Sequence, residues 1–379
     1  MPQPLRILSV FGTRPEAIKM APVLKTLQAQ RGRVVSRVCV TGQQERLLYQ
    51  ALELFGIRPD YDLKIMRASQ TLGYITRRIL ERLEPILIKE QPDWVIVQGD
   101  TTSAMAASLA AFYRRIRVAH VEAGLRTRNT REPFPEELNR RIADLTAEVH
   151  FAPTAAAKRN LIQEGVPPRR IIVTGNTVID ALLEVSRRAH SMDDGPLAVA
   201  LPRGTPLILV TAHRRENFGR PLEHICRALI ELARWYDGGV EIVYPVHRNP
   251  NVWVPVHARL RKIPHITLLP PLDYGAFVRL MRASDLILTD SGGLQEEAPS
   301  LGKPVLVLRN VTERPEAVAA GTVKVIGTSW RRVVQETRRL LEDPQAYRRM
   351  ARRRNPYGNG TANQRIVRTL LGWERRPEA

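Results

Sequence analysis

Three acidic residues stand where a carboxylate could transfer a proton. Asp100 follows the apolar run DWVIVQG, Glu122 follows RVAHV, and Glu136 lies in the proline-bounded segment REPFPEELNRR. Each has an ordinary alternative, because an aspartate after a strand often caps the next helix and a glutamate in a first helical turn compensates the helix dipole. Since all three are expected on one rim of a sheet, we favour a shared role as general acid and base groups.

A second set of residues is suited to holding an anion. In ILTDSGGLQEEAPS, Ser291, Gly292 and Gly293 lie where an apolar run turns into a helical one, and paired glycines let a phosphate approach the backbone. Glu297, one helical turn further on, could accept hydrogen bonds from ribose hydroxyls. The alternative is a tight turn with a serine cap, but helix N-termini at the edges of α/β sheets are ready anion sites. We therefore favour phosphate binding.

The segment VFGTRPEAIKM combines a helix start with two cations. Thr13 and Glu16 fit a capping box and Pro15 suits a first turn, so helix formation alone explains these three residues. It does not explain Arg14, and an arginine at a helix N-terminus suits phosphate or carboxylate binding. Lys19 lies about 140° further round the helix, so it need not share the target of Arg14.

The word Arg-Pro-Glu-Ala occurs three times, and on the order of one such repeat is expected by chance. Only the context of each copy can therefore decide its meaning. The copies of Arg14 and Arg314 both lie near the end of an expected strand, one in each half of the chain. We predict that these two arginines contact a bound anion and that the third copy, in the final residues, is inert; a shared diphosphate is what the resemblance described below implies.

The histidines and cysteines indicate neither a metal site nor a disulfide. His213 and His247 each end an expected strand, no Cys/His spacing resembles a metal motif, and the remaining histidines are interpreted as ordinary. Cys39 and Cys226 are isolated in strand-like and helix-like surroundings, as inert core thiols are. The sequence also lacks the G-x-G-x-x-G and G-K-[ST] fingerprints. We expect no metal, no dinucleotide cofactor and a cytoplasmic protein.

Apolar runs alternate with helical segments along the whole chain, which predicts an α/β fold with two Rossmann-like, doubly wound parallel sheets. The expected strands are LRILSVFG, VVSRVCVTG, DWVIVQGD, RVAHVEAG, EVHFAPT and RIIVTGN, then LILVTAHR, VEIVYPVH, HITLLPPL, DLILTDSG, KPVLVLRN and TVKVIG. The predicted domains are 1–178 and 179–360, and the helix within 361–379 is expected to pack back on the first. Ligands of such sheets bind beyond the carboxyl ends of the strands, where the polar residues described above fall.

The formal charge of +20 raises the question of nucleic acid. The excess is mostly arginine spread over helix faces, and no helix-turn-helix, RNP or zinc-finger signature accompanies it. We therefore prefer a solvated basic surface to nucleic-acid binding, and such a field also suits an anionic small substrate. The longest small-apolar run, SAMAASLAAFY, is too short to cross a bilayer, so no membrane partner is expected.

Ten stretches of the sequence together closely resemble the non-hydrolysing UDP-N-acetylglucosamine 2-epimerases of bacteria. They run in order from Val10 to Gly360: VFGTRPEAIKMAPV, GDTTS, HVEAGLRT, PFPEELNR, TGNTVIDAL, TAHRRENFG, YPVHRNPNV, TDSGGLQEEAPSLGKPVLVLR, TERPEAVAAGT and NPYGNG. The resemblance implies a GT-B-like fold with the substrate in the cleft between two domains. It further implies a homodimer and reversible conversion of UDP-GlcNAc to UDP-ManNAc by anti elimination of UDP to 2-acetamidoglucal and re-addition.

The resemblance also assigns roles by position. It implies that Arg14, Lys19, Asp100, Glu122, Glu136 and His213 belong to the active site. It implies that Ser291, Gly292, Gly293, Glu297 and Arg314 hold diphosphate and ribose, with Phe277 beside the uracil. Carboxylates near C1 and C2 would move the protons and stabilise the charge that develops at C1. Arginines, a helix N-terminus and His213 would hold the departing diphosphate.

Bacterial members of this family can bind a second UDP-GlcNAc as an activator. Gln43, Glu136, Arg214 and His247 match the residues expected at that site. Two positions depart from the family pattern, because Arg46 stands where glutamine is expected and Ser69 where arginine is expected. We therefore expect activation to be weakened or altered.

Two other activities are compatible with the same fold and intermediate. A hydrolysing relative would release free ManNAc and UDP, and a GT-B glycosyltransferase would need an acceptor.

Overall fold

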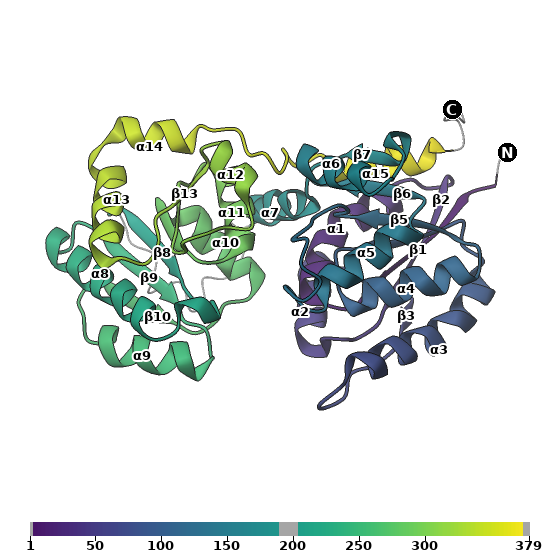
Figure 1. Cartoon of the computed structure of the whole chain (residues 1–379), viewed down its shortest axis with the longest axis horizontal. Helices are drawn as coiled ribbons and strands as arrows, with labels where there is room; N and C mark the ends of the chain where they lie inside the picture. The colour runs from purple at the N-terminus through teal and green to yellow at the C-terminus, as the bar shows by residue number, and fades with distance from the viewer. Residues whose placement is uncertain (1–2, 189–203, 374–379) are drawn as a thin grey trace. The chain divides into compact units, whose positions relative to one another are not determined.

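The structure is a computed structural model that describes residues 3–188 and 204–373, and the chain divides into two compact units. The first comprises the residues up to Ala181 together with those from Tyr357 onward, and the second comprises Leu182–Pro356. The division falls inside one helix, a few residues after the boundary expected from the sequence. The fold class is confirmed: each unit is a parallel sheet layered with helices (Figure 1).

The first unit contains a seven-stranded sheet in its described residues, with order β3-β2-β1-β4-β5-β6-β7. Its strands are β1 (Leu5–Phe11), β2 (Val34–Val40), β3 (Tyr61–Asp62), β4 (Trp94–Gln98), β5 (Arg117–Val121), β6 (Val149–Ala152) and β7 (Ile171–Val173). Every pairing is parallel. The strand order reverses between β1 and β4, which is the switch point where such sheets bind ligands.

The helices of this unit form two rows. α3 (Leu72–Glu90), α4 (Thr102–Tyr113) and α5 (Glu136–Thr146) pack side by side, and so do α2 (Glu45–Phe55), α1 (Arg14–Gln28) and α15 (Ala362–Leu371). Right-handed crossovers explain the rows, because the chain moves in opposite directions across the sheet after β1 and after β4. The unit also contains α6 (Ala155–Gln163) and the start of α7 (Thr177–Arg188).

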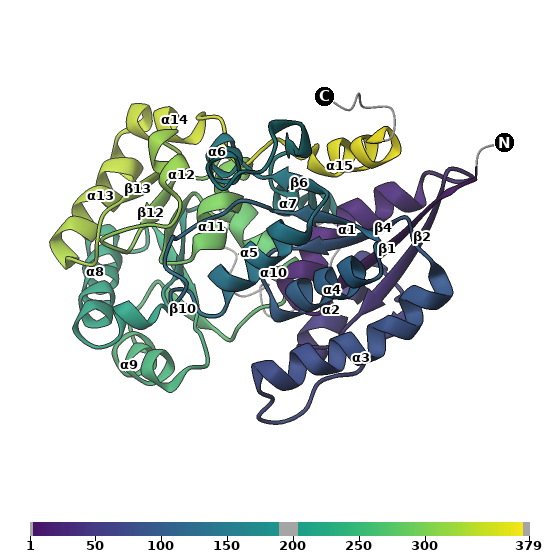
Figure 2. The same ribbon diagram turned by 45° about the vertical axis from the view of Figure 1, so that its right-hand side comes forward.

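Helix α15 returns to the first unit after the chain has built the second. The Asn363 side chain donates a hydrogen bond of 2.8 Å to the Thr26 hydroxyl on α1, and its backbone N–H donates to the Asp180 carboxylate at 2.9 Å. Ile366, Val367 and Leu370 are buried. Figures 1 and 2 both show this helix, in yellow, lying on the first unit.

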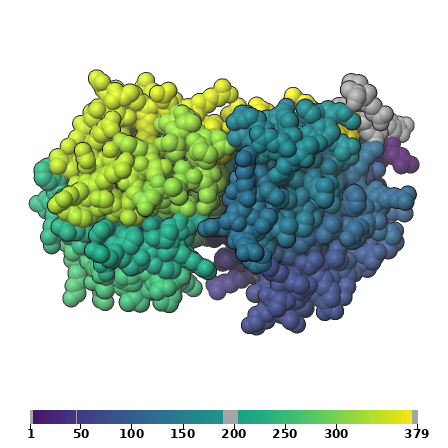
Figure 3. All heavy atoms as spheres, in the orientation of Figure 1, coloured from purple at the N-terminus to yellow at the C-terminus, as the bar shows by residue number. Residues whose placement is uncertain are grey.

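The second unit contains a six-stranded parallel sheet in its described residues, with order β10-β9-β8-β11-β12-β13. Its strands are β8 (Leu207–Thr211), β9 (Glu241–Pro245), β10 (Ile266–Leu269), β11 (Leu286–Thr289), β12 (Val305–Val307) and β13 (Val323–Val325). Its helices are α8 (Arg220–Tyr236), α9 (Pro250–Leu260), α10 (Tyr274–Ala283), α11 (Gly292–Glu297), α12 (Pro315–Ala319), α13 (Trp330–Glu342) and α14 (Pro344–Ala351). The yellow-green atoms of the C-terminal part of this unit cover the upper part of its visible face (Figure 3). The order reverses between β8 and β11, which gives this unit its own switch point.

Both cores are built from strands that are apolar on both faces. In the first unit Leu8, Val10, Val95 and Val97 of β1 and β4 are fully buried. Burial of each such side chain contributes about 1.5–3 kcal/mol to the stability of the fold. Because these strands are buried on both faces of the sheet, they read as continuous apolar runs. Cys39 and Cys226 are buried free thiols, and burial raises the pKa of each to about 12. No described helix is both long and apolar enough to cross a membrane.

Candidate active site

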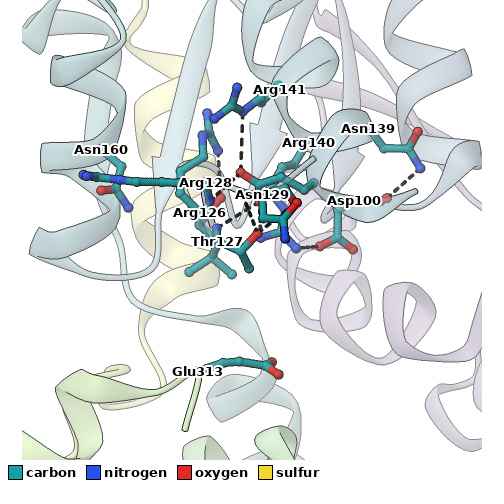
Figure 4. A network of polar contacts seen from close by, with 12 residues as sticks. Asp100, Arg126, Thr127, Arg128, Asn129, Asn139, Arg140, Arg141, Asn160 and Glu313 are labelled. Atoms are coloured by element: carbon teal, nitrogen blue, oxygen red, sulfur yellow. Dashed lines mark hydrogen bonds and ion pairs between the residues drawn. The ribbon is translucent and has the colours of Figure 1, made fainter. Parts of the chain in front are cut away.

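Asp100 lies in the turn after β4, directly beside the switch point of the first unit. Arg140 of α5 forms an ion pair with its carboxylate, and the Asn139 side chain donates a hydrogen bond of 3.0 Å to its backbone carbonyl (Figure 4). The capping alternative for Asp100 is wrong, because the side chain of Thr101 caps α4 by accepting from the Ala104 N–H. The Asp100 carboxylate is therefore available for another task.

Glu122 follows β5, the neighbour of β4, and is held by a cation. The Lys19 ammonium lies 2.8 Å from Oε1 and 2.5 Å from Oε2, and Gln98 donates to Oε2 at 2.9 Å. Lys19 thus contacts a carboxylate 103 residues away rather than the target proposed for Arg14. Glu122 has a φ of +68°, a left-handed conformation that is uncommon for a residue with a side chain. Such outliers gather at functional sites.

Glu16 ties two loops of the pocket together. Its carboxylate accepts hydrogen bonds from the backbone N–H groups of Gly12 and Thr13 and from the Thr101 hydroxyl at 2.7 Å. Burial raises the pKa of this carboxyl, although these hydrogen bonds favour its ionised form. The capping box is confirmed. The link to Thr101 was not predicted, because a local motif gives no information on a partner 85 residues away.

Gly12 is required by the same packing. A Cβ atom at this position would lie 1.9 Å from the Thr41 hydroxyl and 2.5 Å from the Ser103 hydroxyl. Both distances are too short for a real Cβ, so at least these two side chains would have to move. The hydroxyl groups of Thr41 and Ser103 therefore pack directly against the backbone of the β1–α1 turn.

One pocket of the first unit brings the three candidate carboxylates together. Its lining residues are Thr13, Pro15, Glu16, Lys19, Gln43, Gln44, Leu72, Gln98, Gly99, Asp100, Thr101, Thr102, Glu122, Pro135, Glu136 and Asn139. Glu136 is the first residue of α5, as a dipole-compensating glutamate would be, but it also faces this pocket. Arg14, the first residue of α1, is half-buried and is not among the lining residues. The pocket thus joins acids with one lysine.

The second unit builds a polar cluster at its own switch point. The buried Asp290 carboxylate accepts hydrogen bonds from the backbone N–H groups of His213 and Arg214, both at 2.8 Å, and from Asn217 at 2.9 Å. His213 stacks on His247 with ring centroids 5.5 Å apart. Burial lowers the pKa of His213 against the pull of the Asp290 carboxylate, so the ring is neutral near pH 7. Sequence reasoning included Asp290 among the polar residues that follow strands, but it missed Asn217.

Two guanidinium groups converge where α11 begins. A Cβ atom at Gly292 would lie 3.6 Å from Nη2 of Arg214 and 3.7 Å from Nη2 of Arg314. The Ser291 side chain does not cap α11, and Arg314 also pairs with Glu296. Glu297 accepts a hydrogen bond of 2.6 Å from the Tyr274 hydroxyl, and Phe277 lies on α10, partly buried. Paired arginines beside glycine backbone form a suitable site for a diphosphate.

No group of three or more histidine, cysteine, aspartate or glutamate side chains suited to a metal occurs among residues 3–188 and 204–373.

Known proteins resemble this chain over nearly its whole length. A family model described as UDP-N-acetylglucosamine 2-epimerase matches residues 25–371. The UDP-N-acetylglucosamine 2-epimerases of Yersinia pestis and Escherichia coli K12 are 54% and 53% identical to it over 371 residues, covering 97% of this chain and 98% of each relative. The crystal structure of the Neisseria meningitidis UDP-GlcNAc 2-epimerase bound to UDP-GlcNAc superposes with a TM-score of 0.87 at 48% identity, covering 97% of this chain and all of that one.

Proposed function

This chain belongs to the UDP-N-acetylglucosamine 2-epimerase family, and from that premise we propose that it interconverts UDP-GlcNAc and UDP-ManNAc by inversion at C2. The observation that carries the proposal is the pocket in which Asp100, Glu122 and Glu136 lie together with Lys19. A site rich in carboxylates can move a proton on and off one carbon. The guanidinium groups that converge at Gly292 of the second unit support recognition of the diphosphate.

The proposed reaction proceeds by elimination and re-addition. A carboxylate takes the C2 proton while the C1–O bond to UDP breaks, and the C–H electron pair becomes the C1=C2 bond of 2-acetamidoglucal. A proton then returns to C2 on the opposite face, and the UDP oxygen bonds to C1 again. Arg140 forms an ion pair with Asp100, and Lys19 forms one with Glu122. Each carboxylate can therefore accept a proton or stabilise positive charge at C1.

The second unit is assigned the nucleotide. Arg214, Arg314 and the neutral His213 are proposed to hold the diphosphate as it leaves. Ser291, Gly292 and Gly293 offer backbone at the same point, while Glu297 is assigned to the ribose and Phe277 to the uracil. Arg14 is proposed to contact the diphosphate as well.

Turnover of UDP-GlcNAc in deuterated water should place one deuterium at C2 of the UDP-ManNAc formed, because the proton that returns comes from a group that exchanges with solvent. NMR and mass spectrometry of the product measure this. Free ManNAc as a major product would instead indicate the hydrolysing relative, and dependence on an added acceptor would indicate a glycosyltransferase. UDP-ManNAc that retains the original C2 hydrogen would contradict the proposed route.

Activation by a second UDP-GlcNAc is proposed to be weakened in this chain. Gln43 accepts a hydrogen bond of 2.7 Å from Ser103, Arg46 is exposed, and Ser69 has a φ of +52°. A serine in this position cannot supply the guanidinium expected there. The residues left to hold the activator would be Gln43, Glu136, Arg214 and His247. We expect hyperbolic kinetics with UDP-ManNAc alone and no initial lag. An absolute requirement for trace UDP-GlcNAc would refute this proposal.

The homodimer is proposed to form through the edge of the first unit at which α3, α4 and α5 end. Ile88, Phe112, Tyr113 and Leu145 are 50%, 55%, 69% and 85% exposed at the C-terminal ends of these neighbouring helices. Exposed apolar side chains gathered on one edge are typical of an interface, and a two-fold axis would pair that edge with itself.

Light scattering should therefore give twice the chain mass for the wild type and the single mass for Tyr113→Glu/Leu145→Glu. Val254→Glu, which charges another exposed apolar residue, on α9, should remain dimeric. A dimeric double variant would place the interface elsewhere.

A further inference from the structure

His120 is fully buried in β5 and bonded through both ring nitrogens. Nδ1 lies 2.6 Å from the Asp144 carboxylate, and Nε2 lies 2.7 Å from the carbonyl oxygen of Gly99. A carbonyl oxygen can only accept, so Nε2 donates. The Asp144 carboxylate also accepts from the Arg126 guanidinium at 2.7 Å, which favours its ionised form, so Nδ1 donates as well. A ring that donates at both nitrogens is an imidazolium.

The surrounding charges balance this cation. Asp144 of α5 faces both His120 and Arg126, and Arg126 also pairs with Glu164 at 2.6 Å. Two anions thus compensate two cations. Burial works against the charged form of His120, but Asp144 and the Gly99 carbonyl outweigh it and the pKa of His120 is raised. The same pairing lowers the pKa of Asp144 to about 2, despite its burial.

A second buried histidine beside it shows the contrast. His150 of β6 is in register with His120 and donates from Nε2 to the backbone carbonyl of Asp144 at 2.8 Å. Burial lowers the pKa of His150, although the Asp144 carboxylate lies nearby. The cluster therefore carries one histidine charge, on the ring that contacts Gly99.

Gly99 is the residue before Asp100, so its carbonyl group is part of the peptide bond that joins the two residues. Its φ of +70° turns the chain sharply out of β4. The peptide after Asp100 is held by Asn139, and Thr101 is held by Glu16. On the side of the strand, the Gly99 carbonyl accepts from His120 and the Gly99 N–H donates to the Val121 carbonyl, while Arg140 contacts the Asp100 carboxylate itself. Among these contacts, the one from His120 comes from a cation that a change of pH can neutralise.

We infer that His120 is a positioning residue for this reaction: as a charged, doubly donating ring fixed by Asp144, it holds the Gly99 carbonyl and so sets the direction of the Asp100 carboxylate. This inference rests on the proposed role of Asp100. It replaces the sequence-based interpretation of His120 as an ordinary histidine.

Two substitutions separate the two hydrogen bonds. The amide nitrogen of glutamine falls near the place of Nε2, and that of asparagine falls near Nδ1. His120→Gln therefore keeps the donor to Gly99, whereas His120→Asn keeps the donor to Asp144, and both remove the charge. We expect His120→Asn to lower kcat about 100-fold with KM changed less than threefold, since a misplacement near 1 Å has an effect of this size. His120→Gln should stay within about tenfold of wild type.

A merely structural role predicts a different pattern. In that case both His120 variants would lose kcat in proportion to their loss of Tm. His150→Gln, the matched control in the same cluster, would show the same relation between kcat and Tm. A second measurement tests whether His120 acts through Asp100. In an Asp100→Ala background, His120→Asn should cause less than a threefold further loss, because contacts that act through one group are not additive. An undiminished 100-fold loss would overturn the inference.

Spectroscopy of the unaltered enzyme tests the charge even where a variant does not fold. Protein labelled with ¹⁵N-histidine should show one ring with both nitrogens protonated at a pH where exposed histidines have become neutral. As pH rises through the raised folded pKa, this signal and the stability that it contributes should be lost together. Absence of such a ring overturns the inference. It leaves the proposed epimerisation untouched, since that is tested separately by deuterium at C2.

Discussion

Asp100→Asn should lower kcat by about 10²- to 10⁴-fold, the range expected when a proton-transfer group is removed. Asparagine keeps the size of the side chain and an oxygen that can accept from Arg140, but it has neither the charge nor the capacity to take a proton. The residues of the second unit that are proposed to bind the diphosphate are unchanged, so the Kd for UDP should change less than threefold. Initial rates of UDP-ManNAc formation and calorimetric titration with UDP measure the two quantities.

The control for this variant lies at the other end of the same strand. Asp93→Asn alters an exposed aspartate next to β4, at its opposite end, where the carboxylate accepts from the Arg6 N–H. It should leave kcat within about twofold of wild type if only the carboxyl end of the strand takes part in the reaction. Retained turnover in Asp100→Asn would remove Asp100 from the mechanism. Loss of UDP binding together with turnover would instead indicate a role in substrate binding.

Glu122→Gln should have a second large effect, because it removes one of the two carboxylates at adjacent strand ends and also separates a charge pair. We expect kcat to fall by about 10²- to 10⁴-fold and UDP still to bind. Lys19→Met should lower kcat as well, since Glu122 then loses the ammonium that lies 2.5–2.8 Å away.

The double variant Lys19→Met/Glu122→Gln separates the two contributions. Its loss in kcat should be smaller than the product of the single losses, and the coupling should amount to about 0.5–3 kcal/mol. Strictly multiplicative losses would mean that the two side chains act independently. Wild-type turnover in Glu122→Gln would exclude this carboxylate from the chemistry.

Strand positions were predictable because parallel strands that are buried on both faces read as apolar runs. All twelve expected strands are present, and the two-residue strand Tyr61–Asp62 was missed because it is too short to give such a run. The helix start at Thr13–Glu16 was predictable for a similar reason, since a capping box lies within four residues of sequence.

Contacts between side chains that are far apart in the sequence could not be predicted in this way. Helical spacing places Lys19 on one face of α1, but it does not say that this face meets the end of β5, where Glu122 lies. His120 stands inside an apolar strand, where a buried histidine is usually unremarkable. Its role depends on Asp144, which is 24 residues away, and on a carbonyl from another turn. Such contacts are set by the packing of elements rather than by any one motif.

The return of α15 to the first unit has a consequence for how the protein is made. The apolar face that Ile366, Val367 and Leu370 bury is completed only when α15 has emerged, after all of Leu182–Pro356 has been synthesised. At about 5–20 residues per second, the ribosome needs roughly 10–40 s for that interval. During this time the nascent first unit presents an uncovered α1 surface. The N-terminal unit is therefore the first that can begin to fold. It can finish only after the second unit has been synthesised.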